Sequence, residues 1–272
     1  MTRVAPIYLK CPCCNCDFTS TSFSSTNNFG GQTTDFNMCA AGTQVITLQI
    51  HTCPDCGFTG TDDEYEYEEP LDESVRKLIA EKITPLIKGA FPKVPLVFTE
   101  WWIDETNDEP PASTTDRYII APLRSIKKLI SKKISRLFKG DEKIYPEHQY
   151  EFAAWIAKWY NDKSIDIANK YLKAAWCAKE YNHLKKETYY RRLAIEHFEE
   201  ALNKNEIDKS EVAKITYLIG ELYRRIGDKR NANIWFDRVT EAAEGDEGDE
   251  EKQWLIDLAK QQKENPKEFF ER

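Results

Sequence analysis

The sequence has no segment that is typical of a membrane-spanning or secreted protein. No apolar run approaches the ~18 residues that a membrane-spanning helix needs. Residues 1–10 also lack the apolar core of a secretory signal peptide. We therefore expect a cytoplasmic protein without a transmembrane segment.

Catalytic patterns are scarce as well. Histidine occurs only four times in 272 residues, and no Gly-rich phosphate loop, Ser-His-Asp order or paired-carboxylate motif stands out. His183 and His197 lie in helical stretches without the H-E-x-x-H pattern of zinc proteases. We therefore predict no catalytic residue and no organic cofactor, and we expect that the protein is not an enzyme.

The overall charge is acidic. Charged residues make up 31% of the chain and hydrophobic residues 41%, which suits a soluble globular protein with much exposed helix. The formal net charge of -8 opposes a general attraction to nucleic acid, but it says nothing about local basic patches.

Cysteine, in contrast, is abundant and unevenly placed. Seven of the eight cysteines lie within the first 56 residues, and the eighth, Cys177, lies in a helical stretch where it should act as a small buried hydrophobe. Without a signal peptide, such clustering favours metal binding over disulfides, which remain the alternative.

Two CxxC knuckles carry the predicted metal site. Their cysteines are Cys11, Cys14, Cys53 and Cys56. Four thiolates form a closed tetrahedral shell around one structural Zn²⁺, which would contribute on the order of 10 kcal/mol to folding. After each knuckle the chain must turn sharply, and Asn15 and Gly57 are residue types that accept the positive φ of such a turn.

Other residues near the knuckles leave alternatives open. Cys13 and Cys16 form a second CxxC pair interleaved with the first knuckle, and a redox role for them is conceivable. Cys39 is either a thiol outside the metal site or a substitute metal ligand. His51 precedes Cys53 by two residues and could be a ligand, although a histidine at a strand end is the better interpretation.

Composition divides the chain into four regions, with bounds 1–69, 70–145, 146–244 and 245–272. The first is rich in Cys, Thr, Ser and Gly, and alternating stretches such as 44–50 predict short β-strands. The second is mixed, with helices expected at about 72–88 and 123–139. The third is almost continuously helical in pattern. The last holds an acidic linker and a helix from 252 to about 264.

The third region has the spacing of tetratricopeptide hairpins. Gly220 should let two helices approach closely, Tyr223 should fill the interior of that hairpin, and Ala232 and Phe236 should lie on its second helix. An earlier hairpin repeats the Ala/Phe spacing, and another helix starts near Glu147. The predicted fold class is therefore α+β: a small N-terminal β zinc ribbon followed by an α-helical, tetratricopeptide-like repeat domain.

Together these motifs resemble a bacterial and archaeal family of uncharacterised proteins, the DUF2225 family. The matching residues are Cys11 to Cys14 with Phe18, Thr34-Asp35-Phe36, Cys53 to Phe58, and Ala175-Trp176. Asn15 stands where the family usually has glycine. The resemblance covers 11–58 and about 147–240, with residues 91–145 resembling an insertion. The resemblance implies a zinc ribbon followed by helical repeats, and it does not imply a catalysed reaction.

Residues 117–140 hold eight Arg or Lys and no acid. An amphipathic helix of this kind could dock on the protein itself, where 62–73 carry eight acids, or it could bind nucleic acid or an anionic membrane surface. We expect a non-enzymatic zinc-binding adaptor or scaffold that holds a protein partner on its repeats. The alternative is a nucleic-acid- or ribosome-associated factor that uses the zinc ribbon and the basic helix, through Arg124, Lys127, Lys128, Lys132, Lys133 and Arg136.

Overall fold

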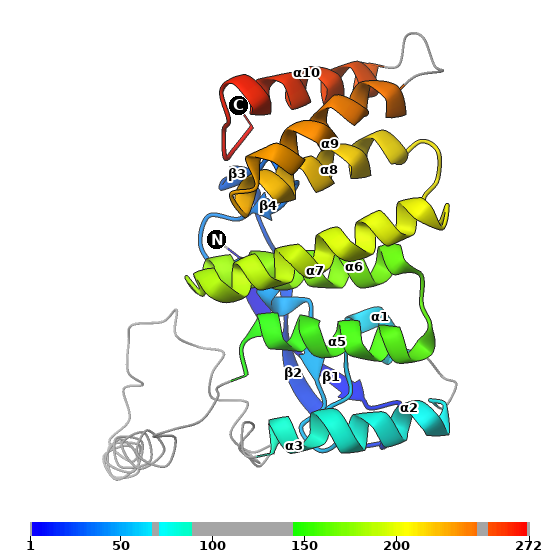
Figure 1. Cartoon of the computed structure of the whole chain (residues 1–272). Coiled ribbons are helices and arrows are strands. Elements are labelled where there is room, and N and C mark those ends of the chain that lie inside the picture. Colours follow the sequence, from blue (N-terminus) through cyan, green and yellow to red (C-terminus); the bar gives the residue numbers. More distant parts are fainter. Residues whose placement is uncertain (1, 67–70, 89–143, 244–249, 271–272) are drawn as a thin grey trace, which may run out of the picture. The chain divides into compact units, whose positions relative to one another are not determined.

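The computed structural model describes residues 2–66, 71–88, 144–243 and 250–270. The described residues up to Lys88 and from Tyr145 onward belong to one compact unit, drawn in colour in Figure 1. The predicted basic helix at 123–139 lies outside the described residues, as does most of the expected acidic linker.

The described N-terminal residues form short antiparallel strand pairs, as the composition predicts. β1 (Arg3–Lys10) pairs with β2 (Asp17–Ser25), β3 (Gly31–Gln32) with β4 (Met38–Cys39), and β5 (His51–Thr52) with β6 (Thr59–Gly60). In the longest pair Lys10 lies opposite Asp17, so the chain reverses within residues 11–16. The first knuckle is therefore the turn of a hairpin.

Residues 44–50 do not form the strand that their alternating apolar residues predict. Val45–Leu48 form a 3-10 helix, η1. Ile46 and Ile50 are buried in the core of the helical region, and the carbonyl oxygen of Ile46 accepts a 3.0 Å hydrogen bond from the Tyr150 hydroxyl. A backbone carbonyl that accepts a hydrogen bond from a side chain on a helix does not need a hydrogen-bond partner on a neighbouring strand. Packing against the helices thus overrides the local pattern.

A helical segment after the strands confirms the helix predicted at about 72–88. It consists of α2 (Glu73–Leu78), a π-helical turn η2 (Ile79–Ile83) and α3 (Thr84–Ile87), and it follows the short helix α1 (Asp62–Tyr65). Its buried residues recur every fourth position, as one face of a helix requires. They are Val75, Ile79, Ile83 and Ile87.

Six further helices follow in the described residues from 144 onward. They are α5 (Pro146–Tyr160), α6 (Ser164–Glu180), α7 (Leu184–Asn203), α8 (Val212–Arg225), α9 (Lys229–Ala242) and α10 (Glu250–Glu264). Each contacts the next in the chain, and Figure 1 shows them following one another as antiparallel neighbours. The helical pattern predicted for 146–244 is confirmed.

A residue with left-handed backbone conformation follows each of four of these helices. Asn161, Asn182, Asn205 and Gly227 all have φ between 53° and 87° and follow α5, α6, α7 and α8. Glycine adopts this conformation without steric cost, and asparagine is the side-chain-bearing residue that tolerates it best. Gly227 and Asp228 form the turn between α8 and α9, and the Asp228 side chain caps α9 by accepting from the backbone N–H of Asn231.

Gly220, Ala232 and Phe236 are buried, as predicted. A Cβ atom built on Gly220 would lie 2.7 Å from the Phe236 ring, so the absence of a side chain on α8 sets the approach of α9. Tyr223 differs from its prediction, because it is only partly buried and its hydroxyl donates to Glu199 on α7, outside its own hairpin. Cys177 lies fully buried in the helical core, where burial raises the pKa of its thiol.

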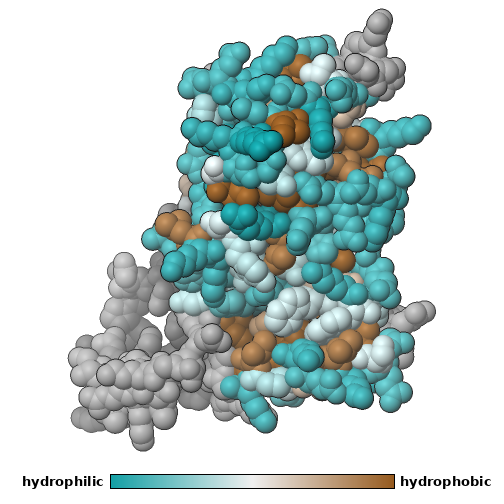
Figure 2. All heavy atoms as spheres, in the orientation of Figure 1, coloured by the Kyte–Doolittle hydropathy of each residue, from teal (hydrophilic) through white to brown (hydrophobic). Residues whose placement is uncertain are grey.

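Side chains connect the N-terminal strands to the helices. Gln149 on α5 donates a 3.1 Å hydrogen bond to the Thr52 hydroxyl on β5, and Lys170 on α6 pairs with Glu64 on α1 at 2.7 Å. Figure 2 shows mostly hydrophilic residues on the face in view, with hydrophobic residues in short bands between them. None of the described helices is both long and apolar enough to pass through a bilayer.

Candidate metal centre

Both knuckles fold in the same way. In the first, the N–H of Cys11 donates to Cys16 O and the N–H of Asn15 donates back to Cys11 O; in the second, Cys53 and Gly57 make the matching bonds. Asn15 has φ 59° and Gly57 has φ 86°, as their residue types predict. The left-handed residue turns the chain back, so that both cysteines of a knuckle face the same side.

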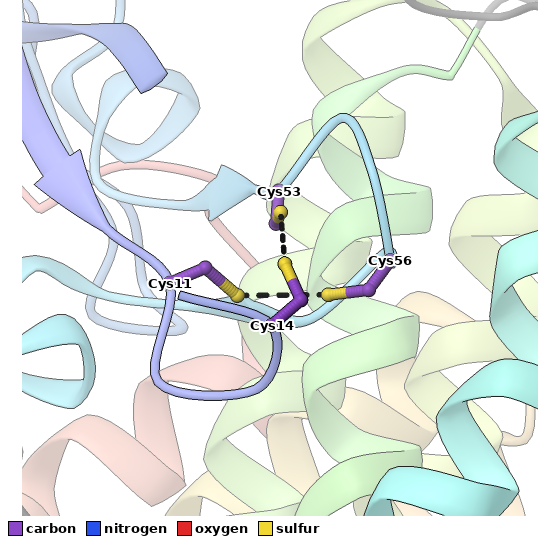
Figure 3. A group of neighbouring side chains, drawn as sticks. All are labelled: Cys11, Cys14, Cys53 and Cys56. Carbon is purple, nitrogen blue, oxygen red and sulfur yellow. Dashed lines mark hydrogen bonds between the residues drawn. The ribbon is translucent and has the colours of Figure 1, made fainter. Parts of the chain in front are cut away.

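The four sulfur atoms converge on one point, as Figure 3 shows. All lie within 4.8 Å of one another. Cys11 Sγ is 3.5 Å from Cys56 Sγ, and Cys14 Sγ is 3.6 Å from Cys53 Sγ. A tetrahedral zinc with ~2.3 Å bonds to sulfur has S–S edges of about 3.8 Å. The group therefore fits a four-sulfur metal site, with thiols here standing in for the thiolates that an ion would bind.

The same distances argue against disulfides. A sulfur–sulfur bond is about 2.0 Å long, and all eight cysteines are free. Cys13, Cys16 and Cys39 do not join the convergent group, which is the one such group of potential metal ligands among the described residues. The Sγ of Cys16 instead lies 3.5 Å from the carbonyl oxygen of Asp17.

Neighbouring thiols and burial act on the pKa of Cys11, Cys53 and Cys56, and the net pKa of each is raised. Cys11 and Cys53 are fully buried, whereas Cys14 is exposed. The neighbouring Cys11 thiol and burial both raise the pKa of Cys53. Because a metal binds the thiolate, ion binding must displace these protons, and affinity should fall as the pH is lowered.

An aromatic cluster supports both knuckles. Phe18, which follows the first knuckle, meets Tyr65 edge-on with ring centroids 5.5 Å apart, and Phe58 after the second knuckle meets the same ring at 5.1 Å. The Tyr65 hydroxyl donates to the backbone oxygen atoms of His51 and Phe58. The phenylalanine that follows each cysteine pair thus packs on a shared ring from α1.

The second knuckle also packs against the helix that follows it. A Cβ atom on Gly57 would lie 2.8 Å from Ile83 and 3.3 Å from Ile87. The Thr84 hydroxyl donates to the carbonyl oxygen of Cys56. Only glycine meets both requirements at position 57, the positive φ and the close approach of the helix.

His51 lies outside the sulfur group. Its Nδ1 is 2.8 Å from Ser20 Oγ and its Nε2 is 2.5 Å from Asp62 Oδ1. The sequence did not reveal this contact, because the three residues are far apart in the chain. A serine hydrolase places Nδ1 against the aspartate and Nε2 against the serine. The order here is reversed and the imidazole is fully buried, and the contact joins β2, β5 and α1.

A second polar site, which we call the Asp35 cluster, lies in the loop after β3. The Asp35 carboxylate is buried, 3.5 Å from Arg191 Nη2 and 3.3 Å from Arg225 Nη2. Trp176 Nε1 donates to it at 3.1 Å. Burial acts to raise the pKa of Asp35, but Arg225 and Arg191 outweigh that effect, and the net pKa is lowered.

Neighbouring residues extend the Asp35 cluster to helix α8. The Thr34 hydroxyl donates to Glu221 Oε1 at 2.7 Å, and Glu221 is fully buried. Arg224 and Arg225 pair with this carboxylate at 2.7 and 2.6 Å. Each buried acid thus has an arginine partner, as stable burial of charge requires. The cluster connects the N-terminal loop to α6, α7 and α8.

The four-sulfur group and the Asp35 cluster contain the motifs by which the chain resembles a known family. A family model described as an uncharacterized protein conserved in bacteria (DUF2225) matches residues 8–100 and 122–265. The chain belongs to this family. The unmatched segment, 101–121, is shorter than the insertion expected over 91–145, so the family pattern includes the basic residues from 122 onward. No curated protein and no solved structure matches the chain significantly.

Proposed function

We propose that this DUF2225 protein is a zinc-stabilised scaffold, not an enzyme, and that its tetratricopeptide-like hairpins hold a protein partner. The observation that carries the proposal is the convergence of four sulfur atoms within 4.8 Å. Four thiolates fill the tetrahedral shell of zinc and leave no position for water or substrate. Such an ion stabilises the fold and does not act on a substrate.

The location of the four cysteines supports a structural role. The ion would join the hairpin turn between β1 and β2 to the turn between β5 and β6, and the second turn packs on Ile83 and Ile87. Metal binding in such sites is coupled to folding, with apparent free energies of about 10–16 kcal/mol. The strand region has few large buried residues of its own, so it should depend on the ion.

The helices support the scaffold part of the proposal. The pairs α6/α7 and α8/α9 are consecutive antiparallel hairpins, and Gly220, Ala232 and Phe236 occupy the close contact between α8 and α9. Stacked hairpins of this kind bury a shared core and present extended surfaces to partners. We infer that the family uses these surfaces for binding.

Purification of the tagged full-length protein from its native cells, at low and at high salt, tests the proposal. The scaffold proposal predicts a specific protein partner that remains bound at high salt. Co-purification of RNA or DNA that is lost at high salt would instead favour phosphate contacts through the basic helix. Absence of any specific partner, together with a fold that is indifferent to metal removal, would overturn the proposal.

A further inference from the structure

A cavity of about 400 Å³ lies beside the Asp35 cluster, between β3, α10 and the C-terminal residues. Its size is within the range of ligand-binding pockets. None of its lining residues carries a charge; they include Gln32, Trp254, Gln262, Phe269 and Phe270. An occupant should therefore be uncharged where it enters the cavity.

Gln262 is a buried polar residue of the cavity wall. The side chain is 2% exposed, and its Oε1 accepts a 3.0 Å hydrogen bond from the N–H of Lys267. Because only the oxygen can accept from that N–H, the amide orientation is fixed and the NH₂ group is directed elsewhere. Its Nε2 has no hydrogen-bond partner within the described part of the chain. A buried donor of this kind favours a ligand that carries a carbonyl oxygen.

Phe269 supplies an open strand edge at the same place. It forms an antiparallel bridge with Thr33, through bonds from Thr34 N to Glu268 O and from Phe270 N to Gln32 O. In this pattern the N–H and C=O of Phe269 itself face away from Thr33. Neither makes a hydrogen bond to another described residue. An extended segment could pair with this edge, as peptides do in β-augmentation.

Aromatic side chains at the cavity are partly exposed. Trp254 is 45% exposed and Phe269 44%, and the Trp254 ring lies 5.4 Å from that of Phe270. Phe36, with φ 68°, packs against both Trp254 and Phe270. A left-handed phenylalanine is conformationally costly, and here it supports the rings of the cavity. Exposed tryptophan and phenylalanine are typical anchors for a partner's apolar side chain.

Hydrogen bonds hold the segment before Phe269 in place. Arg224 Nη2 donates to Lys267 O at 3.3 Å, and Arg225 Nη2 donates to Glu268 O at 3.1 Å. The Thr34 hydroxyl also reaches Lys267 O. The Asp35 cluster therefore fixes the C-terminal segment, which reduces the ordering cost of binding.

We propose that this cavity binds an extended, uncharged segment of a partner polypeptide. The segment adds a strand along Phe269, places an apolar side chain against Trp254 and Phe270, and offers a backbone carbonyl to Gln262. A peptide is favoured over a small molecule because the open backbone edge and the cavity adjoin at Phe269. This inference rests on the proposed scaffold function and names the place and chemistry of the contact.

Selection of random heptapeptides on the metal-loaded full-length protein tests the inference. Enriched peptides should have an uncharged centre with an aromatic or aliphatic residue. Trp254→Ala should weaken their binding at least tenfold. Gln262→Glu, which keeps the acceptor for Lys267 but removes the donor, should do the same. Tyr8→Ala, an exposed aromatic on β1, should leave affinity unchanged, and circular dichroism should show all three variants folded.

Backbone pairing has its own test. N-methylation of the enriched peptide, one position at a time, should abolish binding only at the residue whose N–H donates to the Phe269 carbonyl, because the backbone groups of Lys267 already have partners in the protein. No enrichment, a charged consensus, or unchanged affinity of Trp254→Ala overturns the inference. So does a homodimer that dissociates in Trp254→Ala, since the occupant would then be a second copy of the chain.

Failure of this inference is distinguishable from failure of the scaffold proposal. If a native partner co-purifies equally with the wild-type protein and with Trp254→Ala, the partner is held elsewhere and only the cavity is excluded. If peptides bind the cavity but no partner is found in cells, the cavity is a peptide-binding site and the scaffold role fails.

Discussion

Trp176 Nε1 donates a 3.1 Å hydrogen bond to Asp35 Oδ2 across 141 residues of sequence. Thr34-Asp35-Phe36 and Ala175-Trp176 are two of the motifs by which the chain resembles its family. Ala175 is fully buried beside this contact in the helical core. The two motifs are therefore two halves of one structural contact, which holds the N-terminal loop on the helices.

Loss of that hydrogen bond should be measurable. Trp176→Phe keeps an aromatic ring but removes the donor, so the free energy of unfolding should fall by about 1.5–3 kcal/mol, the range for bonds to charged groups. Trp235→Phe is the control, because that ring faces Arg238 on the same helix and makes no bond to Asp35. Urea unfolding of the metal-loaded proteins makes the comparison. Equal losses in both variants would contradict the role of the bond.

The Asp35 cluster should make stability depend on pH. The pKa of Asp35 is lowered in the folded protein. The ionised carboxylate therefore stabilises the fold above the unfolded-state pKa of about 3.9, and this contribution is lost as the pH falls through the lowered folded pKa. Asp35→Asn should remove this loss of stability in acid. It should also cost about 3–5 kcal/mol at neutral pH, because Arg191 and Arg225 lose their buried partner.

Unfolding free energies measured from neutral pH down to the acid transition test this prediction. Wild type and Asp35→Asn should differ most at neutral pH and converge in acid. A constant difference across that range would show that the Asp35 carboxylate is not ionised in the folded state.

The sequence predicted the elements whose cause is local. The knuckle turns follow from Asn15 and Gly57, and the close contact of α8 and α9 follows from the absence of a side chain at Gly220. The helix ends at Asn161, Asn182 and Asn205 carried the same left-handed signal as Gly227. Asparagine is a weaker indicator of a left-handed helix end than glycine, so these three helix ends were less evident from the sequence.

Features set by distant contacts were not predictable. Residues 44–50 alternate like a strand, but Tyr150 and the helical core select a 3-10 helix. The Ser20–His51–Asp62 contact and the arginine partners of Asp35 join segments far apart in the chain. No local periodicity encodes such pairs, and only the folded topology brings them together.

The contact between Gly220 and Phe236 gives a third prediction. Alanine favours a helix over glycine by about 1 kcal/mol, yet a Cβ at position 220 would lie 2.7 Å from the buried Phe236 ring. Overpacking costs about 1–3 kcal/mol, so after the gain in helix propensity Gly220→Ala should destabilise the protein by a net of up to about 2 kcal/mol. Thermal unfolding measures this change.

A double-mutant cycle identifies the cause. Phe236→Leu removes part of the ring, so adding Gly220→Ala on that background should cost less than on the wild type. Additive effects of the two substitutions would place the strain elsewhere.

The assignment of metal ligands gives a fourth prediction. Cys11→Ser or Cys56→Ser should lower the bound metal below one ion per chain and destabilise the strand region. Cys13→Ser and Cys16→Ser are matched controls in the same loop, and each should keep the ion because neither sulfur joins the convergent group. Metal loss in the two control variants would show that the interleaved pair supplies ligands.

X-ray absorption spectroscopy at the zinc edge, with metal analysis of the purified full-length protein, tests the central claim most directly. We predict one zinc per chain with four sulfur neighbours at about 2.3 Å and no oxygen or nitrogen in the first shell. A protein that folds without bound metal would contradict the claim. So would a zinc with fewer than four sulfur ligands and an open position for water.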